Sequence, residues 1–344
     1  MDKISLDNKN KRDSKLDTLR FFALICIMLA HSQPNEVISQ LRNFDVVLMV
    51  LLIGCSYYIS NSKKQINYMS YVKKRFVRLI IPTWIFISIF FIVFYLISVL
   101  RAENYYFGLN QIVGSYTIMN GINSIGFIWI MRVFFIIALV CPVILIFSNR
   151  IKNNLIYFLY LSVYYFIYAL LILFSGKIHG LISLFYINII IYGVGYSFIA
   201  AIGIRLPIMN KKEVDFLCVA FMFLSLLLMY HNNFAYTQQF KYPPTIYYIS
   251  YGMFVSLLLY RLLDFQIIEK VFNNVFVRFV SITSAWIYFW HIIFCYIIML
   301  FGTHISFITS CLAGRFLFLL SGALFVTYIH ELIKAKIKRK SISY

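Results

Sequence analysis

The first apolar segment holds two side chains that together could perform acid–base chemistry inside a membrane. It reads LDTLRFFALICIMLAHS and places Arg20 eleven positions before His31. Because a helix turns about 100° and rises about 1.5 Å per residue, the two side chains share one face about 16 Å apart. With Arg20 at a membrane surface, His31 lies near the middle of the hydrocarbon, where a titratable group needs a partner, a cavity or a function. A neutral imidazole suits a general base. The alternatives are a surface anchor for Arg20 and a structural hydrogen bond for His31.

A carboxylate opens the second apolar segment, FDVVLMVLLIGCSYY (44–58). Asp45 follows a turn that contains Pro34 and lies at the outer end of this segment. It could approach His31 and orient the imidazole, as carboxylates do in hydrolase triads. We therefore include Asp45 with His31 and Arg20 as candidate catalytic residues. The alternative for Asp45 is an ordinary surface carboxylate, and Glu36 is a weaker candidate for the same orienting role.

A basic cluster precedes the third apolar segment in the stretch YVKKRFVRLIIP (71–82). Arg75 and Arg78 are spaced i, i+3, and Lys74 and Arg78 are spaced i, i+4, so they share a helix face. Guanidinium groups bind phosphate oxygens in a bidentate manner, which makes the cluster a candidate phosphate clamp. Apolar residues at helical spacing across 66–78 favour instead a helix in the cytoplasmic interface that anchors anionic lipid and turns at Pro82.

The elements that must position these residues are membrane helices. The chain is 62% hydrophobic and 12% charged, and its mean hydropathy is +0.83. These values exclude an ordinary soluble domain and indicate an all-α, polytopic integral membrane protein. Six cysteines are scattered singly through apolar segments and are expected to be small buried residues, without a disulfide framework or a metal site.

Ten apolar segments are long enough to cross a bilayer. We expect spans at about 16–34, 44–60, 79–100, 124–147, 154–174, 180–202, 213–230, 245–263, 280–300 and 308–332. This divides the chain into a cytoplasmic tail (1–15), a transmembrane domain (16–332) and a basic cytoplasmic tail (333–344). The first apolar segment is expected to be an uncleaved helix, since no small-residue cleavage site follows it.

The basic residues predict the orientation of the spans. With the N-terminus in the cytoplasm, all but six of the 31 Lys and Arg residues fall on the cytoplasmic side, the exceptions being Arg42, Arg101, Arg132, Lys177, Lys241 and Arg315. Both termini are then cytoplasmic. The formal net charge of +19 therefore reflects membrane topology and does not predict a nucleic-acid partner.

In their order and spacing, these motifs resemble the acyltransferase-3 family of membrane proteins. The resemblance includes Arg20 and His31 with ten residues between them in the first span, and Arg75-x-x-Arg78 before a Pro-led third span. The stretches WIMRVFFIIALVCP (129–142) and AWIYFWHI (285–292) also resemble the family, as does a glycine-containing turn around Gly54 and Ser56. Ile53 stands where the family would have a serine. The resemblance extends from about Leu16 to Tyr328.

This resemblance implies transfer of an acyl group, most often acetyl, from cytoplasmic acyl-CoA to a hydroxyl of a cell-surface glycan or its lipid-linked precursor. Arg75, Arg78 and Lys74 would bind the CoA phosphates together with Arg20, and His31 would take the proton from the acceptor hydroxyl. Acyl-CoA is then the donor, with acetyl-CoA preferred. Membrane lipids, the glycan and other polysaccharide-synthesis proteins are the expected partners, in the plasma membrane of a bacterium.

Four further residues are candidates for the acceptor side. Arg132 lies inside the outer end of the fourth span, where it contributes to an acceptor cavity, pairs with Asp45 or extends to the interface. His291 is mid-span in the ninth segment and has either a function or a structural hydrogen bond. Lys241 and Tyr242 lie in the outer loop QQFKYPPTIYY (238–248), where tyrosines could stack on sugar rings or anchor the chain at the interface.

Two other classes of protein fit the composition less well. A transporter or exporter of glycan precursors would show inverted repeats with helices broken at matching positions, which the sequence lacks, although Gly193 and Gly195 could break the sixth span. A membrane sensor would need a soluble readout domain. We therefore predict a membrane-bound O-acyltransferase, with an exporter as the alternative.

Overall fold

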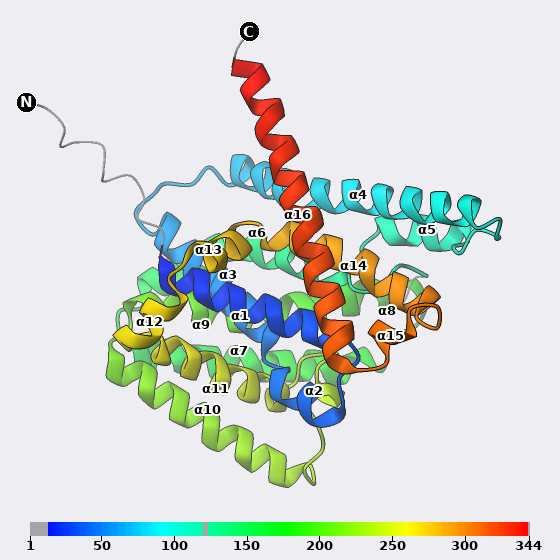
Figure 1. The fold of residues 1–344 in the computed structure, drawn as a ribbon. Coiled ribbons are helices and arrows are strands. Elements are labelled where there is room, and N and C mark those ends of the chain that lie inside the picture. Colours follow the sequence, from blue (N-terminus) through cyan, green and yellow to red (C-terminus); the bar gives the residue numbers. More distant parts are fainter. Residues whose placement is uncertain (1–12, 120–122, 343–344) are drawn as a thin grey trace, which may run out of the picture.

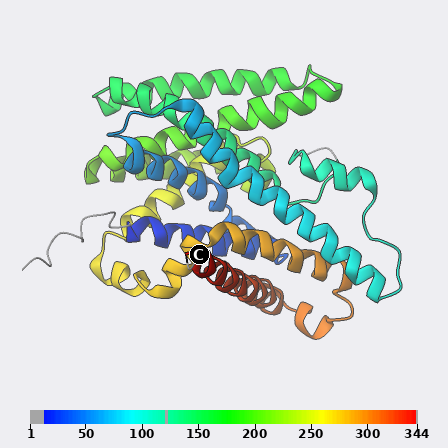
Figure 2. The same cartoon turned by 90° about the horizontal axis from the view of Figure 1, so that it is seen from above.

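The computed structural model describes residues 13–119 and 123–342, and every regular element in these ranges is a helix (Figure 1). This confirms the all-α, polytopic fold that the composition predicts. Most of the long helices run across the molecule in Figure 1, with α4 (Tyr68–Leu100) and α10 (Lys211–His231) on opposite faces, whereas α16 crosses the others steeply. Figure 2 shows α4 lying obliquely over the helices beneath it.

The ten predicted spans all coincide with helices. The remaining elements, in chain order, are α1 (Ser14–His31), α2 (Glu36–Arg42), α3 (Asp45–Asn61), α5 (Leu109–Tyr116), α6 (Trp129–Arg150), α7 (Asn154–Ser175), α8 (Gly180–Phe185), the π-helix η1 (Tyr186–Ile191), α9 (Tyr192–Arg205), η2 (Leu206–Ile208), η3 (Thr237–Phe240), α11 (Ile246–Leu262), α12 (Gln266–Phe272), α13 (Val275–Ile282), α14 (Ser284–Phe301), α15 (Ser306–Thr309) and α16 (Leu312–Ile342).

The number of helices that meet the criteria for a membrane span is slightly lower than ten. Within the described residues, eight helices are long and apolar enough, and α11 with α12 brings the number to nine if this pair, which bends by 96° at its break, is one span. Helix α1 differs because Lys15, Asp17 and Arg20 occupy its first two turns. Helix α16 continues through most of the predicted basic tail, to Ile342.

Asparagine and aspartate side chains begin the helices at one end of the bundle. Asn67, Asn153, Asn210 and Asn274 accept hydrogen bonds from the first turns of α4, α7, α10 and α13, and Asp13 does so for α1. Such caps satisfy backbone N–H groups that have no partner within the helix. These caps are local features of the sequence, so local sequence helps to fix where these helices begin.

Helix α3 lies at the centre of the bundle and packs most extensively against α9. Gly54 and Gly203 face each other there: a Cβ on Gly54 would collide with the Ala200 carbonyl oxygen, and one on Gly203 with that of Leu51. The predicted turn around Gly54 and Ser56 is therefore wrong, since α3 is continuous and glycine is needed for close helix packing.

Helix α4 corrects a second expectation. It runs without a break from Tyr68 to Leu100 with Pro82 inside it, so the basic stretch is the beginning of the span rather than a separate interfacial helix. Its Tyr71 hydroxyl donates to the Ala138 carbonyl of α6 at 2.9 Å. Pro142 has no N–H to bond that carbonyl four residues earlier, so Tyr71 replaces the missing partner.

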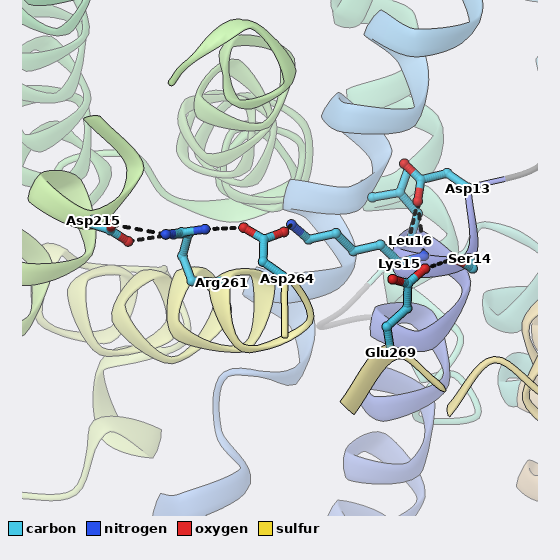
Figure 3. Close-up of polar contacts among 8 residues, drawn as sticks. All are labelled: Asp13, Ser14, Lys15, Leu16, Asp215, Arg261, Asp264 and Glu269. Atoms are coloured by element: carbon cyan, nitrogen blue, oxygen red, sulfur yellow. Dashed lines mark hydrogen bonds and ion pairs between the residues drawn. The ribbon is translucent and has the colours of Figure 1, made fainter. Parts of the chain in front are cut away.

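Ion pairs join three helices at the end where α1 begins (Figure 3). Arg261 of α11 binds Asp215 of α10 at 2.5 and 3.1 Å, and it also contacts Asp264. Asp264 in turn accepts from Lys15 of α1 at 2.6 Å. Burial raises the pKa of Asp264, but the hydrogen bond from Lys15 and its positive charge together lower it by more. The pKa of Asp264 is therefore below its usual value. This chain of charges fixes α1 against α10 and α11.

Candidate active site

The predicted base His31 contacts a second histidine. His31 is the last residue of α1, and its Nδ1 lies 2.7 Å from Nε2 of His291 in the middle of α14. The two rings are almost parallel, with centroids 5.0 Å apart and an interplanar angle of 4°. His291 is completely buried. The structure therefore places His291 directly against the candidate base.

The next hydrogen bond determines the tautomers of both rings. His291 Nδ1 contacts the backbone carbonyl of Tyr288, one turn earlier in α14. A carbonyl only accepts, so His291 Nδ1 carries the proton and, in the neutral ring, Nε2 accepts. His31 Nδ1 must then donate to His291, which leaves the lone pair on His31 Nε2. This is the tautomer that a general base requires.

His31 faces a cavity of about 360 Å³ with an aromatic side. Phe127, Trp129, Tyr242 and Tyr288 contribute rings to its lining, and the Phe127 ring lies 4.4 Å from the His31 ring. Phe127 has a φ of 73°, which is unusual for a bulky residue, and its carbonyl accepts from the Tyr288 hydroxyl. Flat apolar surfaces with a few polar groups are typical of sites for small ligands.

The lining of the cavity also carries charge. Asp45 is buried and pairs with Arg42 at 2.8 Å and with Lys241 at 3.3 Å. Lys241 also donates to Asn43 at 3.3 Å. Burial lowers the pKa of Lys241, whereas the adjacent Asp45 carboxylate favours its ammonium form. Asp45 thus belongs to an ion cluster in the cavity wall, and the hydrogen-bond partner of His31 is His291 rather than Asp45.

Arg20 lies at the other end of α1 from His31. It donates to Asp17 at 3.0 Å and to Ser56 of α3 at 2.5 Å, and Asp17 also accepts from Ser281 of α13 at 2.8 Å. Arg20 therefore ties α1 to α3, and Asp17 ties it to α13. The contact also gives Ser56 a role that the predicted turn did not include.

The predicted phosphate clamp lies along the first turns of α4. Lys74 and Arg78 are exposed, and the Arg75 guanidinium lies 4.9 Å from the centre of the Tyr71 ring. The contact with Tyr71 holds Arg75 in the same helix that Tyr71 joins to α6. The three cations thus share one helix, as predicted.

Arg132 does not pair with Asp45 but contacts a residue that packs against the cavity lining. Its Nη1 donates to the Ile118 carbonyl at 2.5 Å, and its guanidinium lies 5.7 Å from the centre of the Tyr192 ring. That ring in turn packs against Trp129 and Tyr242 of the cavity lining. Arg132 is therefore one layer behind the candidate acceptor surface.

Three residues of the site were missed by the sequence analysis. Arg42 was counted only as an outer charge, although it is three residues before Asp45, a spacing that permits an ion pair. Tyr288 lies one turn before His291 in the quoted stretch AWIYFWHI. Phe127 gave no signal, because its importance comes from its backbone conformation.

Cys295 lies next to the histidine pair and raises the question of a metal. The candidate ligand atoms of His31, His291 and Cys295 lie within 4.8 Å of one another. With zinc–nitrogen bonds of about 2.0–2.1 Å, tetrahedral ligands are about 3.3 Å apart. The 2.7 Å between the imidazole nitrogens is shorter and matches a hydrogen bond. We therefore interpret His31 and His291 as a hydrogen-bonded pair rather than as metal ligands.

Comparison with known proteins gives one match. Neither the curated proteins nor the solved structures contain a significant match. Residues 13–332, nearly the whole chain, match the acyltransferase-3 family, which is described as an acyltransferase domain. The matched range includes α1 with Arg20 and His31, the basic turns of α4 and the His291 segment of α14. The chain is a multi-pass membrane protein that belongs to the acyltransferase-3 family of acyltransferases.

Proposed function

We propose that this acyltransferase transfers an acyl group, preferentially acetyl, from cytoplasmic acyl-CoA to a hydroxyl of a cell-surface glycan or its lipid-linked precursor. The observation that carries the proposal is the chain from Tyr288 through His291 to His31, which ends in an unprotonated Nε2. The adjoining cavity has aromatic rings on which a sugar could stack and charged groups that could orient it.

His31 acts as the general base in this mechanism. Its Nε2 accepts the proton of the acceptor hydroxyl while the hydroxyl oxygen attacks the thioester carbonyl. The tetrahedral intermediate collapses with cleavage of the carbon–sulfur bond, and the departing thiolate takes the proton from the His31 imidazolium. The products are an ester and free CoA. His291 stabilises the imidazolium because its Nε2 accepts from His31 Nδ1 throughout.

The donor is proposed to approach from the end where Arg20, Lys74, Arg75 and Arg78 lie. CoA is polyanionic and cannot enter hydrocarbon, so its phosphates remain with these cations. The narrow pantetheine arm then extends along α1, over the roughly 16 Å that separate Arg20 from His31. The acyl group meets the acceptor at the opposite end of that helix.

The test compares surface glycans from cells that make wild-type protein, His31→Ala or no protein. We expect the ester signals in NMR and mass spectra to disappear in the last two, while the polymer still reaches the surface. Loss of the polymer itself would indicate an exporter. Normal ester content with His31→Ala, at equal protein abundance, would contradict the proposed base.

A further inference from the structure

The charged side of the cavity is not electrically balanced. Arg42, Asp45 and Lys241 are only 8%, 1% and 3% exposed. Both cations share the single Asp45 carboxylate, at 2.8 and 3.3 Å. Among the described residues that line the cavity, Asp45 is the one acid, so this side carries an excess of one positive charge.

Such an excess is costly unless a ligand compensates it. A buried charge without a counter-charge loses much of its hydration free energy. In addition, Arg42 Nε is buried and has no hydrogen-bond partner within the described part of the chain. The guanidinium of Arg42 is thus incompletely hydrogen-bonded, and the cavity that it lines holds one uncompensated positive charge, which an anionic oxygen would neutralise.

We propose that the acceptor carries an anionic group, a carboxylate or a phosphate, which binds between Arg42 and Lys241. This inference rests on the proposed function only in identifying the ligand as the acyl acceptor. The aromatic rings of the cavity lining, including Trp129 and Tyr242, receive the sugar ring, and the anionic group contacts Arg42 and Lys241 of the same lining. The acceptor hydroxyl is thereby directed to His31.

The donor's phosphates are a poorer match for this position. The cavity adjoins the last turn of α1, whereas the cations of the proposed donor site lie at the first turns of α1 and α4. CoA bound with its thioester at His31 would place its phosphates toward Arg20, away from Lys241. The uncompensated charge is thus available to the acceptor.

The experiment measures binding without acyl transfer. Purified protein in nanodiscs of uncharged lipid, free of acyl-CoA, is titrated with methyl β-glucoside, methyl β-glucuronide and glucose 1-phosphate. Wild type is compared with Lys241→Met, which leaves the Arg42–Asp45 pair neutral, and with Asp45→Asn, which adds one positive charge. Lys177→Met removes an exposed lysine between α7 and α8 and serves as the matched control.

We expect an anionic probe to bind wild type and Lys177→Met at least tenfold more tightly than the neutral glucoside, as for hydrogen bonds to charged groups. Lys241→Met should abolish this preference and Asp45→Asn should increase it. Tighter binding of the glucuronide identifies a sugar carboxylate, and tighter binding of glucose 1-phosphate identifies a phosphate.

Equal binding of the three probes to wild type overturns the proposal. So does a preference for anionic probes that Lys241→Met does not reduce. Because Lys241→Met keeps one cation with the carboxylate, it tests the charge even if Asp45→Asn fails to fold. Failure here leaves the proposed acyl transfer intact, with a neutral acceptor. Failure of the glycan comparison would instead remove the proposed function while leaving an anion site.

Discussion

At the scale of single residues, the site depends on which nitrogen of each imidazole carries the proton. A hydrogen bond from His291 to a backbone carbonyl fixes its tautomer more rigidly than a carboxylate would, because a carbonyl has no proton to exchange. A neutral partner also leaves His31 uncharged in the resting protein, which suits a group that lies among membrane helices. The positioning role therefore passes from Asp45, where the sequence suggested it, to His291.

His291 gives the first prediction. His291→Leu should lower turnover by about a hundredfold, because His31 loses the acceptor that fixes both its orientation and its productive tautomer. His291→Gln should recover part of this loss, since an amide oxygen can accept from His31 Nδ1. The Michaelis constant for acyl-CoA should change little in either variant.

Steady-state kinetics in proteoliposomes measure this effect, with His304→Ala, an exposed histidine after α14, as the control. A structural role for His291 predicts instead that Gln and Leu are equally impaired in thermal stability and turnover. Equal turnover of all three His291 proteins would contradict the positioning role.

The donor cations give a second prediction at this scale. Arg75→Ala and Arg78→Ala should each weaken acyl-CoA binding by roughly ten- to a hundredfold, since charge-assisted hydrogen bonds contribute about 1.5–3 kcal/mol. Arg→Lys should recover only part of the affinity, because the charge returns without the bidentate geometry. Added salt should weaken binding to wild type.

Titration of CoA into protein in neutral detergent distinguishes this from a lipid anchor. Lys73→Ala, an exposed neighbour of the cluster, serves as the control. If the arginines only anchor lipid, all preparations bind CoA equally, and the donor must enter elsewhere.

At the scale of the helices, the sequence predicted where the helices lie along the chain better than whether they are interrupted. The apolar runs located the starts of α7 and α10, because that signal is local, whereas the predicted third span began at about 79 and α4 begins at Tyr68. Pro82 and Gly54 were misread as breaks. Their effects depend on neighbouring helices: membrane helices tolerate proline, and a glycine permits close packing when another helix approaches. These neighbours are far away in the sequence.

The contact between α4 and α6 gives a prediction at this scale. Tyr71→Phe should destabilise the protein by about 1–3 kcal/mol, since the Ala138 carbonyl loses its hydrogen-bond donor while the ring and its contact with Arg75 remain. Pro142→Ala restores the backbone N–H that can bond the same carbonyl. The double variant should therefore be more stable than Tyr71→Phe alone.

Thermal unfolding of the four proteins in one detergent completes a double-mutant cycle. Additive effects of the two substitutions would show that Tyr71 does not replace the bond that Pro142 lacks. Tyr68→Phe, which removes a longer hydrogen bond of 3.3 Å to the adjacent Leu139 carbonyl, serves as the control and should have a smaller effect.

At the scale of the whole molecule, the site is built from segments that meet only after folding. His31 and His291 are separated by 260 residues, and Asp45 and Lys241 by 196. Each residue type was conspicuous in its own apolar setting, so the sequence could nominate all four. It could not pair them, since periodicity reports which face a residue occupies and not which helix covers that face.

The orientation of the bundle in the membrane gives the last prediction. Cys311 is exposed just before α16, and Arg315 of that helix donates to the carbonyls of Ser32 and Gln33 directly after α1. Cys311 therefore lies at the His31 end of α1, which the basic residues predict to be extracytoplasmic. A membrane-impermeant maleimide should label the protein in intact cells, and Cys311→Ser should abolish that labelling, because Cys55, Cys141, Cys218 and Cys295 are buried and Cys26 is only partly accessible. Labelling that occurs only in permeabilised cells would show that the orientation is the reverse of the predicted one. The acceptor cavity would then open to the cytoplasm, and the proposed acceptor would be a cytoplasmic precursor rather than a glycan at the cell surface.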